Sequence, residues 1–386
     1  MTMQSPTDSL LQGVGRVCMT LPSRGHAYDE MVSVLTAVVQ ELGGDVFLAR
    51  DGDRTILEAD VTILFGRCAA FGDSARLLNA HSSRRPATIL WHVELLPPEV
   101  IPAHAEEAAR KLVRCGVGKL PKPLRSLIRC VPSHSSLVNL LRRIRYAQLA
   151  RRCGWDRRFP DDRVHAREWH HAVENALWLK QWYSDTWCDC LAVSTMPRRR
   201  LLTEMGIPCE YAPLGYHPLW GTDRGENRDL DVVFLGHVKR TGRERLVSRI
   251  ARRLAEAGTK FVVVDRDCYG EERTKLLNRA KISLDLVKST WEMPMMRLLV
   301  SMGCGALVVS NCSVDPYPFR DEHLVRVDSD SLAAAILEHL HDEPARRQMA
   351  EAAYHHLTTE LAWYPVVSRI LQRALSQRKT CHGVTL

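Results

Sequence analysis

The sequence lacks any uninterrupted run of about 20 apolar residues, the length that a helix needs to cross the hydrocarbon core of a bilayer. Its first residues, MTMQSPTDSLLQGVGR, have neither a basic start nor a long apolar core, so we expect no signal peptide. We therefore expect a cytoplasmic protein, with peripheral contact at the inner face of the membrane left open as an alternative.

Paired C-x-x-C motifs are also absent, although the chain has 12 cysteines. In a chain that is not secreted, this irregular spacing predicts free, buried thiols. His170 and Glu174 are four residues apart and share one face of a predicted helix, but no His-Glu-x-x-His pattern surrounds them. We therefore expect core packing there, no metal site and no bound cofactor.

The length of 386 residues exceeds the limit of about 250–300 residues for a single hydrophobic core. A hydrophobic content of 45% with 25% charged residues is typical of a globular protein. Residues 221–229 are polar and contain glycine, which is typical of a linker. The sequence therefore predicts a first domain over 1–220 and a second domain that begins at 221.

Strands and helices alternate in the second half. Apolar runs at 231–235, 261–264, 282–287 and 306–310 are separated by helical segments that include 271–280 and 296–302. This order predicts a parallel sheet with helices on both faces, in which ligands bind at the carboxyl ends of the strands. The segments expected at those ends are Gly236, Asp265, 288–292 and 311–315.

A basic cluster follows the glycine that stops the first of these strands. Lys239, Arg240, Arg243 and Arg245 lie on the predicted turn after Gly236 and on the start of the next helix. A helix N-terminus offers free N–H groups and a positive dipole end, so added cations there suit a diphosphate. A solvated, charged helix face is the alternative interpretation.

Three motifs of the second half carry a family resemblance. They are Gly236 followed by Arg243, the segment LLNRAKISL at 276–284, and Arg297 followed by Gly305-Ala306. Over roughly 125 residues the chain resembles the C-terminal, donor-binding domain of GT-B glycosyltransferases. It is most similar to the CgeB-like, spore-maturation group, and more distantly to the retaining enzymes with an E-x7-E motif.

The resemblance implies two Rossmann-like domains that face each other, with a donor-binding domain over 221–362 and a helix in 363–386 that crosses back to the first domain. It implies transfer of a sugar from a nucleotide diphosphate-sugar, the co-substrate, without a metal and with retention of configuration. Glu292 would approach the donor sugar. The implied diphosphate and nucleotide residues are Gly236, Lys239, Arg240, Arg243, Asp265, Lys288, Arg297 and Gly305.

One position departs from the family pattern. Val300 stands where the family has its second Glu, eight residues after Glu292. That Glu accepts hydrogen bonds from the ribose hydroxyls in the family, and a valine side chain accepts none. The resemblance therefore supports the fold more strongly than it supports donor binding.

The first half has an α/β pattern of its own. Predicted strands at 16–21, 45–49, 61–65 and 88–91, with a helix at 28–42, indicate a second Rossmann-like domain. His26 follows the first strand, and His92 and Glu94 follow the last. These three residues are our candidates for binding the acceptor and for catalysis. The alternative is that they only terminate strands.

A strongly basic stretch interrupts this domain. Residues 110–158, part of a predicted helical insertion over about 110–187, contain 14 Lys or Arg and a single acidic residue, Asp156. Such a segment suits peripheral contact with an anionic membrane or a polyanionic acceptor; a solvated helix packed on the domain is the alternative. No recognition motif accompanies it, so we expect no nucleic-acid partner.

The D-x-D tripeptides at 51–53 and 265–267 match the metal-diphosphate motif of the GT-A fold, but their surroundings fit a turn and a GT-B strand end. The sequence therefore favours a GT-B glycosyltransferase that acts on a small-molecule, glycan or lipid-linked acceptor. The alternative function is a catalytically inactive GT-B-shaped scaffold that docks on an anionic membrane or a polyanion.

Overall fold

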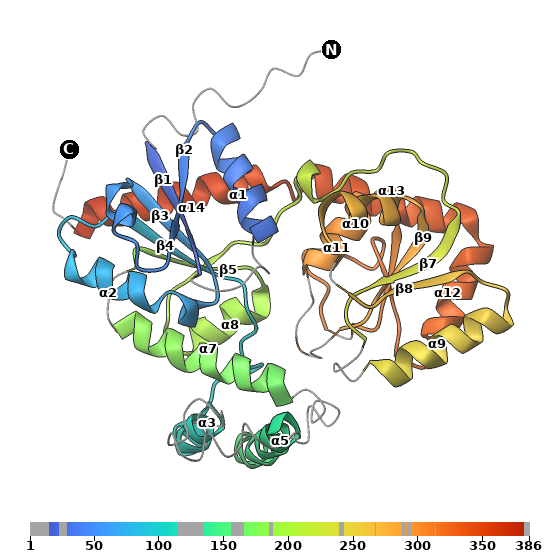
Figure 1. Ribbon diagram of the computed structural model, residues 1–386, viewed down its shortest axis with the longest axis horizontal. Coiled ribbons are helices and arrows are strands. Elements are labelled where there is room, and N and C mark those ends of the chain that lie inside the picture. The colour runs from blue at the N-terminus through green and yellow to red at the C-terminus, as the bar shows by residue number, and fades with distance from the viewer. Residues whose placement is uncertain are drawn as a thin grey trace.

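A computed structural model describes residues 15–22, 29–113, 134–155, 166–184, 188–238, 243–266, 268–287, 291, 295–312 and 314–381. They form two α/β domains, connected by a stretch that includes 221–229 and by a C-terminal helix that returns to the first domain (Figure 1). Among these residues, no helix combines the length and the apolar character that crossing a membrane requires.

The first domain is built on a parallel six-stranded sheet in the order β2-β1-β3-β4-β5-β6. The sequences VTILFG and ATILWH make β3 and β4 apolar throughout, and both strands are buried at every position because helices cover both faces of the sheet. The strands are β1 (Arg16–Leu21), β2 (Asp45–Arg50), β3 (Val61–Gly66), β4 (Ala87–His92), β5 (Cys190–Val193) and β6 (Glu210–Tyr211).

The described helices of this domain are α1 (Asp29–Glu41), α2 (Gly72–Ala80), α3 (Glu106–Val113), α5 (His134–Cys153), α7 (Ala166–Ser184) and α8 (Met196–Glu204). The short 3-10 turns are η2 (Arg54–Glu58), η3 (Cys68–Ala70), η4 (Ala103–Ala105) and η7 (Pro218–Trp220).

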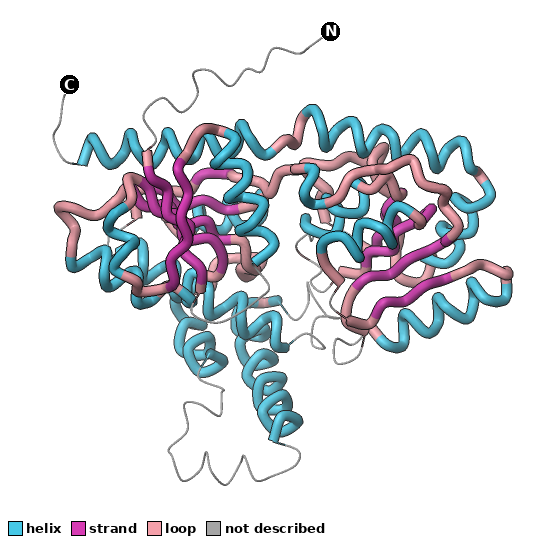
Figure 2. The backbone as a smooth tube through the Cα atoms, turned by 45° about the horizontal axis from the view of Figure 1, so that its top comes forward, coloured by secondary structure: helices cyan, strands magenta, loops and turns pink. Residues whose placement is uncertain are grey.

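Helices α3 and α5 project away from the sheet (Figure 2). Trp155 stacks on Trp169 there, with ring centroids 4.9 Å apart, and Trp291 of the second domain packs on Trp169 at 4.3 Å. The projecting unit thus has an aromatic core that includes a residue from the second domain.

The second domain contains a parallel five-stranded sheet in the order β11-β10-β9-β7-β8. Its strands are β7 (Leu230–Leu235), β8 (Phe261–Val264), β9 (Ala280–Asp285), β10 (Leu307–Ser310) and β11 (Val325–Arg326). Its helices are α9 (Glu244–Glu256), α10 (Gly270–Asn278), α11 (Met295–Gly303), α12 (Leu332–His341) and α13 (Glu343–Thr359). The two sheets confirm the predicted α/β class with two Rossmann-like domains.

The last helix, α14 (Trp363–Cys381), packs on the sheet of the first domain. Trp363 is fully buried, and its ring meets those of Trp91 and Trp220 at 5.8 Å each. Arg369 donates a hydrogen bond to the carbonyl of Tyr211 at 2.6 Å. The second half of the chain therefore supplies part of the core of the first domain.

One strand boundary differs from the prediction for a clear reason. The apolar pattern predicts a strand that continues to residue 287, but β9 ends at Asp285. The guanidinium groups of Arg243 and Arg297 both donate to the carbonyl oxygen of Leu286, which removes that carbonyl from the strand ladder. Two side chains that are distant in sequence thus end the strand.

Candidate functional site

A cavity of about 270 Å³ lies between the two domains, at the carboxyl ends of β7 and β9. Helix α1 of the first domain contributes Glu30 and Met31 to its wall. The second domain contributes Leu235, Gly236, Arg266, Cys268, Tyr269, Arg273, Ser283, Leu284, Asp285, Met296, Arg297, Val300 and Ser301. The carboxyl edge of a parallel sheet is where α/β proteins bind their ligands, so this interdomain cavity is the candidate site.

Gly236 ends β7 at the wall of the interdomain cavity. Its φ of +136° lies in the region that side chains with a Cβ rarely adopt, while a Cβ placed there would have no heavy atom closer than 3.9 Å. The backbone conformation, and not a lack of space, therefore requires glycine. The turn brings the backbone to the cavity without a side chain in the way.

Arg297 is held at the wall by a buried carboxylate. Its Nε donates to Oδ1 of Asp285 at 2.6 Å and one terminal nitrogen donates to the carbonyl of Leu286 at 3.0 Å. Asp285 is almost fully buried and also accepts from Ser310 Oγ at 2.9 Å. Arg297 thus both supports the sheet edge and presents a fixed, partly exposed positive charge to the cavity.

Arg243, a predicted diphosphate residue, directly precedes α9, and one of its terminal nitrogens lies 3.9 Å from the position that a Cβ would take on the cavity residue Gly236. It is buried, donates to the carbonyl of Leu286, and lies 5.9 Å from the ring centroid of Phe234. It is not among the described residues that line the interdomain cavity. Lys239, Arg240, Lys288 and Glu292 lie outside the described residues.

Two further predicted donor residues support loops. Asp265 is exposed and accepts a hydrogen bond from the backbone N–H of Val238 at 2.6 Å, which fixes the loop after β7. Gly305 has a φ of +70° and precedes β10, at the edge of the sheet opposite the cavity; a Cβ there would approach Asp223 Oδ2 to 2.2 Å. Neither residue lines the cavity among the described residues.

Val300 does line the interdomain cavity, as its place in the motif implies. It is 4% exposed, and its methyl groups share the wall with Met296 and Leu235. Ser283 and Ser301 also line the cavity, but their hydroxyls are hydrogen-bonded to each other at 2.8 Å. The wall at the family's ribose-binding position is therefore apolar.

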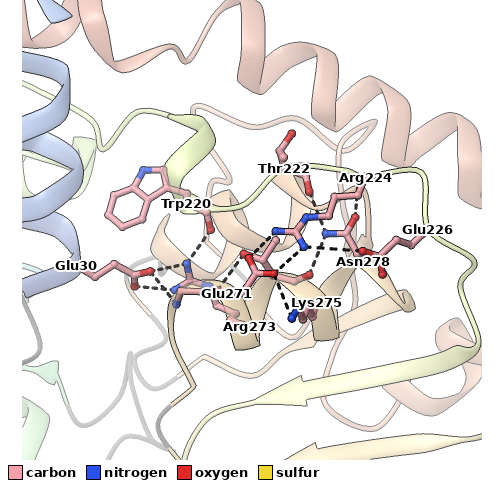
Figure 3. Close-up of polar contacts among 11 residues, drawn as sticks. Glu30, Trp220, Thr222, Arg224, Glu226, Glu271, Arg273, Lys275 and Asn278 are labelled. Atoms are coloured by element: carbon pink, nitrogen blue, oxygen red, sulfur yellow. Dashed lines mark hydrogen bonds and ion pairs between the residues drawn. The ribbon is translucent and has the colours of Figure 1, made fainter.

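An ion pair joins the two domains beside this cavity. The buried guanidinium of Arg273 on α10 donates to both carboxylate oxygens of Glu30 on α1, each at 2.8 Å, and to the carbonyl of Trp220 at 2.7 Å (Figure 3). The backbone N–H of Gly270, at the start of α10, also donates to Glu30 at 3.2 Å. Glu30 thus neutralises Arg273 and caps a helix of the other domain.

His92 and Glu94, two of the acceptor-side candidates, do not line the interdomain cavity. His92 at the end of β4 is fully buried, and burial holds the pKa of its imidazole well below the ordinary value because it disfavours the charged form. Glu94 is half-buried, and neither residue is among the described residues that line the cavity. His26 lies outside the described residues.

The only described cluster with a metal-ligand arrangement is His170, His171 and Glu174 on α7, whose ligand atoms lie within 4.8 Å of one another. Arg67 already donates to the carboxylate of Glu174. Burial alone would raise the pKa of Glu174, but the neighbouring His171 and the charge of Arg67 lower it to about 2. A cation would have to displace Arg67, so this geometry favours an internal ion pair.

Sequence reasoning missed Glu30, Arg266, Tyr269 and Arg273. Arg266 and Tyr269 follow β8 closely, so the rule that ligands bind at strand ends could have found them. Glu30 and Arg273 carry no local signal, because each acquires its role from a contact across 243 residues of sequence. Only the packing of the two domains brings them together.

The sequence model of the glycosyl transferase-like family matches residues 239–372. No curated protein sequence matches the chain. Among solved structures, sucrose-phosphate synthase from Thermosynechococcus elongatus aligns over 93% of this chain and 98% of its own, at 11% identity and a TM-score of 0.54.

Two other solved structures are similar to this chain, one over nearly its whole length and one over about half of it. HepE of Anabaena, solved with UDP-glucose, aligns over 94% of this chain and 99% of its own, at 10% identity and a TM-score of 0.49. A mutant of S. aureus TarM, solved with fondaparinux, alpha-GlcNAc-glycerol and UDP, aligns over 53% of this chain at 12% identity and a TM-score of 0.42; the match spans 46% of TarM. The chain has the GT-B fold of two facing Rossmann-like domains, and the part of it that matches the glycosyl transferase-like family is residues 239–372.

Proposed function

We propose that this protein is a glycosyltransferase of the CgeB-like type that binds a nucleotide diphosphate-sugar in the interdomain cavity. The observation that carries the proposal is the position of this cavity, at the carboxyl ends of β7 and β9 and mostly within the glycosyl transferase-like domain. The bond between the sugar's anomeric carbon and the diphosphate oxygen breaks, and a bond to an acceptor oxygen forms. The acceptor proton passes to a base, and the nucleoside diphosphate leaves.

In this proposal the protein supplies the positive charge for the departing diphosphate. Arg297 is fixed by Asp285 at the cavity wall, and α11 begins at Met295, next to the cavity residue Met296. A preorganised guanidinium and a helix N-terminus stabilise developing negative charge without a metal. Lys239, Arg240 and Lys288, which follow β7 and β9 in the sequence, would add further charge, and Glu292 would orient the sugar.

Retention of configuration, and an acceptor side served by His92, Glu94 or His26, stay predictions from the family resemblance. The complete burial of His92 favours a role in supporting the strand end over direct proton transfer. Because Val300 offers no hydrogen bond to a ribose, we expect the base and the diphosphate to contribute most of the donor affinity.

Tyr269 provides the first test. Its ring lines the interdomain cavity yet is 53% exposed, so it can stack on a nucleotide base at little cost to folding. We expect Tyr269→Ala to weaken binding of the preferred nucleoside diphosphate about tenfold, since stacking of one base on an aromatic ring contributes on the order of 1–3 kcal/mol. Calorimetric titration with UDP, TDP, GDP and ADP measures this.

Tyr317→Ala is the matched control, because Tyr317 is also 53% exposed in the second domain and does not line the cavity. A thermal-shift panel of the same nucleotides and their sugars tests the proposal as a whole, because a ligand that binds only the folded protein raises its melting temperature. If no nucleotide stabilises the protein, the enzyme proposal fails.

A specific surface favours a second function, docking on an anionic membrane. Leu140, Leu141 and Ile144 on the projecting helix α5 are 52%, 43% and 47% exposed, and the exposed Arg151 and Arg152 follow two turns later. Helical spacing places all five on one side of the helix, which we call the outer face of α5. Apolar side chains beside arginines suit the boundary between headgroups and acyl chains.

The double variant Leu141→Asp/Ile144→Asp should therefore lose at least about tenfold in affinity for vesicles of phosphatidylglycerol and phosphatidylcholine, measured by flotation. Leu48→Asp serves as the control, because Leu48 is 57% exposed on β2, away from α5. Equal binding to pure phosphatidylcholine would argue against an anionic surface as the partner. Vesicle binding in a protein that no nucleotide stabilises would instead favour a non-catalytic scaffold.

A further inference from the structure

A second and larger cavity, of about 840 Å³, opens in the first domain. Its wall includes Arg85, Asp189 and Cys190 at the amino ends of β4 and β5, together with side chains from α7, α8 and α14. It therefore lies at the edge of the sheet opposite the one that faces the interdomain cavity. We call it the amino-edge cavity. Its volume is within the range of about 300–1,000 Å³ that is typical of small-molecule sites.

The inner part of the amino-edge cavity is apolar. Leu90, Leu179, Trp182 and Leu191 line it, together with several cysteine thiols. Burial raises the pKa of the Cys188 thiol to about 12, so this thiol is uncharged at neutral pH and behaves as an apolar group. The wall therefore offers an aromatic ring and aliphatic side chains to a hydrophobic body.

The remainder of the wall has an excess of positive charge. Among the described residues that line the cavity, four are arginines and two are carboxylates, an excess of two positive charges. Asp189 neutralises Arg85, whereas Glu210 is shared between Arg373, at 3.3 Å, and Arg369, at 3.8 Å. Arg199 is exposed on α8 and lines the same cavity.

Arginines from two helices bring positive charge to this cavity. Arg378 on α14 donates a hydrogen bond to the carbonyl of Ser82 at 3.1 Å. Arg199 and Arg373 approach the same cavity from α8 and α14. Guanidinium groups bind carboxylate and phosphate groups through charge-assisted hydrogen bonds.

We propose that the amino-edge cavity binds a small amphipathic anion, with its apolar body against Trp182 and Leu191 and its anionic head at Arg199 and Arg373. The site is separate from the proposed donor site, because it lies at the amino edge of the other sheet and contains none of the interdomain cavity residues. Its ligand class is an apolar chain or ring system with one carboxylate or phosphate.

Calorimetric titration of the full chain with decanoate and with 1-decanol, both below their aggregation limits, tests this site. Decanoate should bind at least about tenfold more tightly than 1-decanol, because only the carboxylate pairs with the arginines. Arg199→Gln should lower decanoate affinity about tenfold and leave 1-decanol affinity unchanged. Arg200→Gln is the matched control, because Arg200 is the exposed neighbour of Arg199 on α8 and is not among the described residues that line the cavity.

A blocking variant separates this site from other apolar surfaces. Thr203 is exposed on α8 and lines the cavity, so Thr203→Trp should obstruct it and abolish binding of both probes without disturbing the core. Absence of decanoate binding up to about 1 mM would overturn the proposal. So would equal decanoate affinity in Thr203→Trp and the unmodified protein. Neither result depends on nucleotide binding, so these experiments do not test the proposal that the interdomain cavity binds a nucleotide diphosphate-sugar.

Discussion

Replacement of Asp189 by alanine is expected to destabilise the first domain by about 3–5 kcal/mol, because it leaves a buried arginine without its counter-charge. The side chains of Arg85 and Asp189 are only 6% and 3% exposed. A terminal nitrogen of Arg85 donates to Asp189 Oδ1 at 2.9 Å, and the backbone N–H of Thr88 donates to Oδ2 at 2.7 Å. Urea denaturation followed by tryptophan fluorescence measures the loss in the free energy of unfolding.

The exposed pair of Arg76 and Asp73 supplies the control. Their side chains are 79% and 58% exposed, so solvent screens the attraction and Arg76→Ala should change stability by less than about 1 kcal/mol. The interpretation of Arg85–Asp189 as a structural ion pair is wrong if Asp189→Ala and Arg76→Ala unfold at the same urea concentration.

Removal of the Glu30 carboxylate is expected to uncouple the two domains. Glu30→Ala leaves Arg273, whose side chain is 6% exposed, with only the carbonyl of Trp220, and it removes the cap from the start of α10. We expect a loss of about 3 kcal/mol, since Glu30 itself is 22% exposed and its interactions are partly screened. The lost free energy is that of the contact between the domains, so we expect the two domains to unfold in two separate transitions.

Differential scanning calorimetry and limited proteolysis of the linker at 221–229 measure this uncoupling. Glu272→Ala is the control, because Glu272 lies on the same helix as Arg273 and pairs with Arg266 within the second domain and in solvent. Cleavage at equal rates in the Glu30→Ala and Glu272→Ala proteins would contradict the coupling. A retained single transition in Glu30→Ala would contradict it as well.

The strands and helices of both domains were predictable because the burial of each one is reflected in the hydrophobic pattern of its own residues. The strands Arg16–Leu21 and Phe261–Val264 begin and end as predicted from their apolar runs. Helix α14 runs from Trp363 to Cys381, within the predicted range of 363–386. Buried parallel strands need continuous apolar sequence and their connecting helices need apolar stripes, so pattern alone indicates the α/β class.

The candidate site was predictable only in part, because a local sequence pattern does not show contacts between distant elements. Gly236 and Val300 follow from strand ends and motif spacing, and both line the interdomain cavity. Spacing carries no information about burial, so it did not predict that Arg243 is buried and donates to the carbonyl of Leu286. It also did not predict that a buried carboxylate from β9 orients Arg297 at the cavity.

By itself, the sequence determined the two α/β domains, the glycine turn after β7 and the apolar residue at the family's ribose position, because each depends on neighbours along the chain. The tertiary structure alone decided that Glu30 neutralises Arg273 across the domain boundary and that arginines from α8 and α14 surround one cavity. Contacts of this kind depend on how distant elements pack. A local pattern of hydrophobicity and charge does not record that packing.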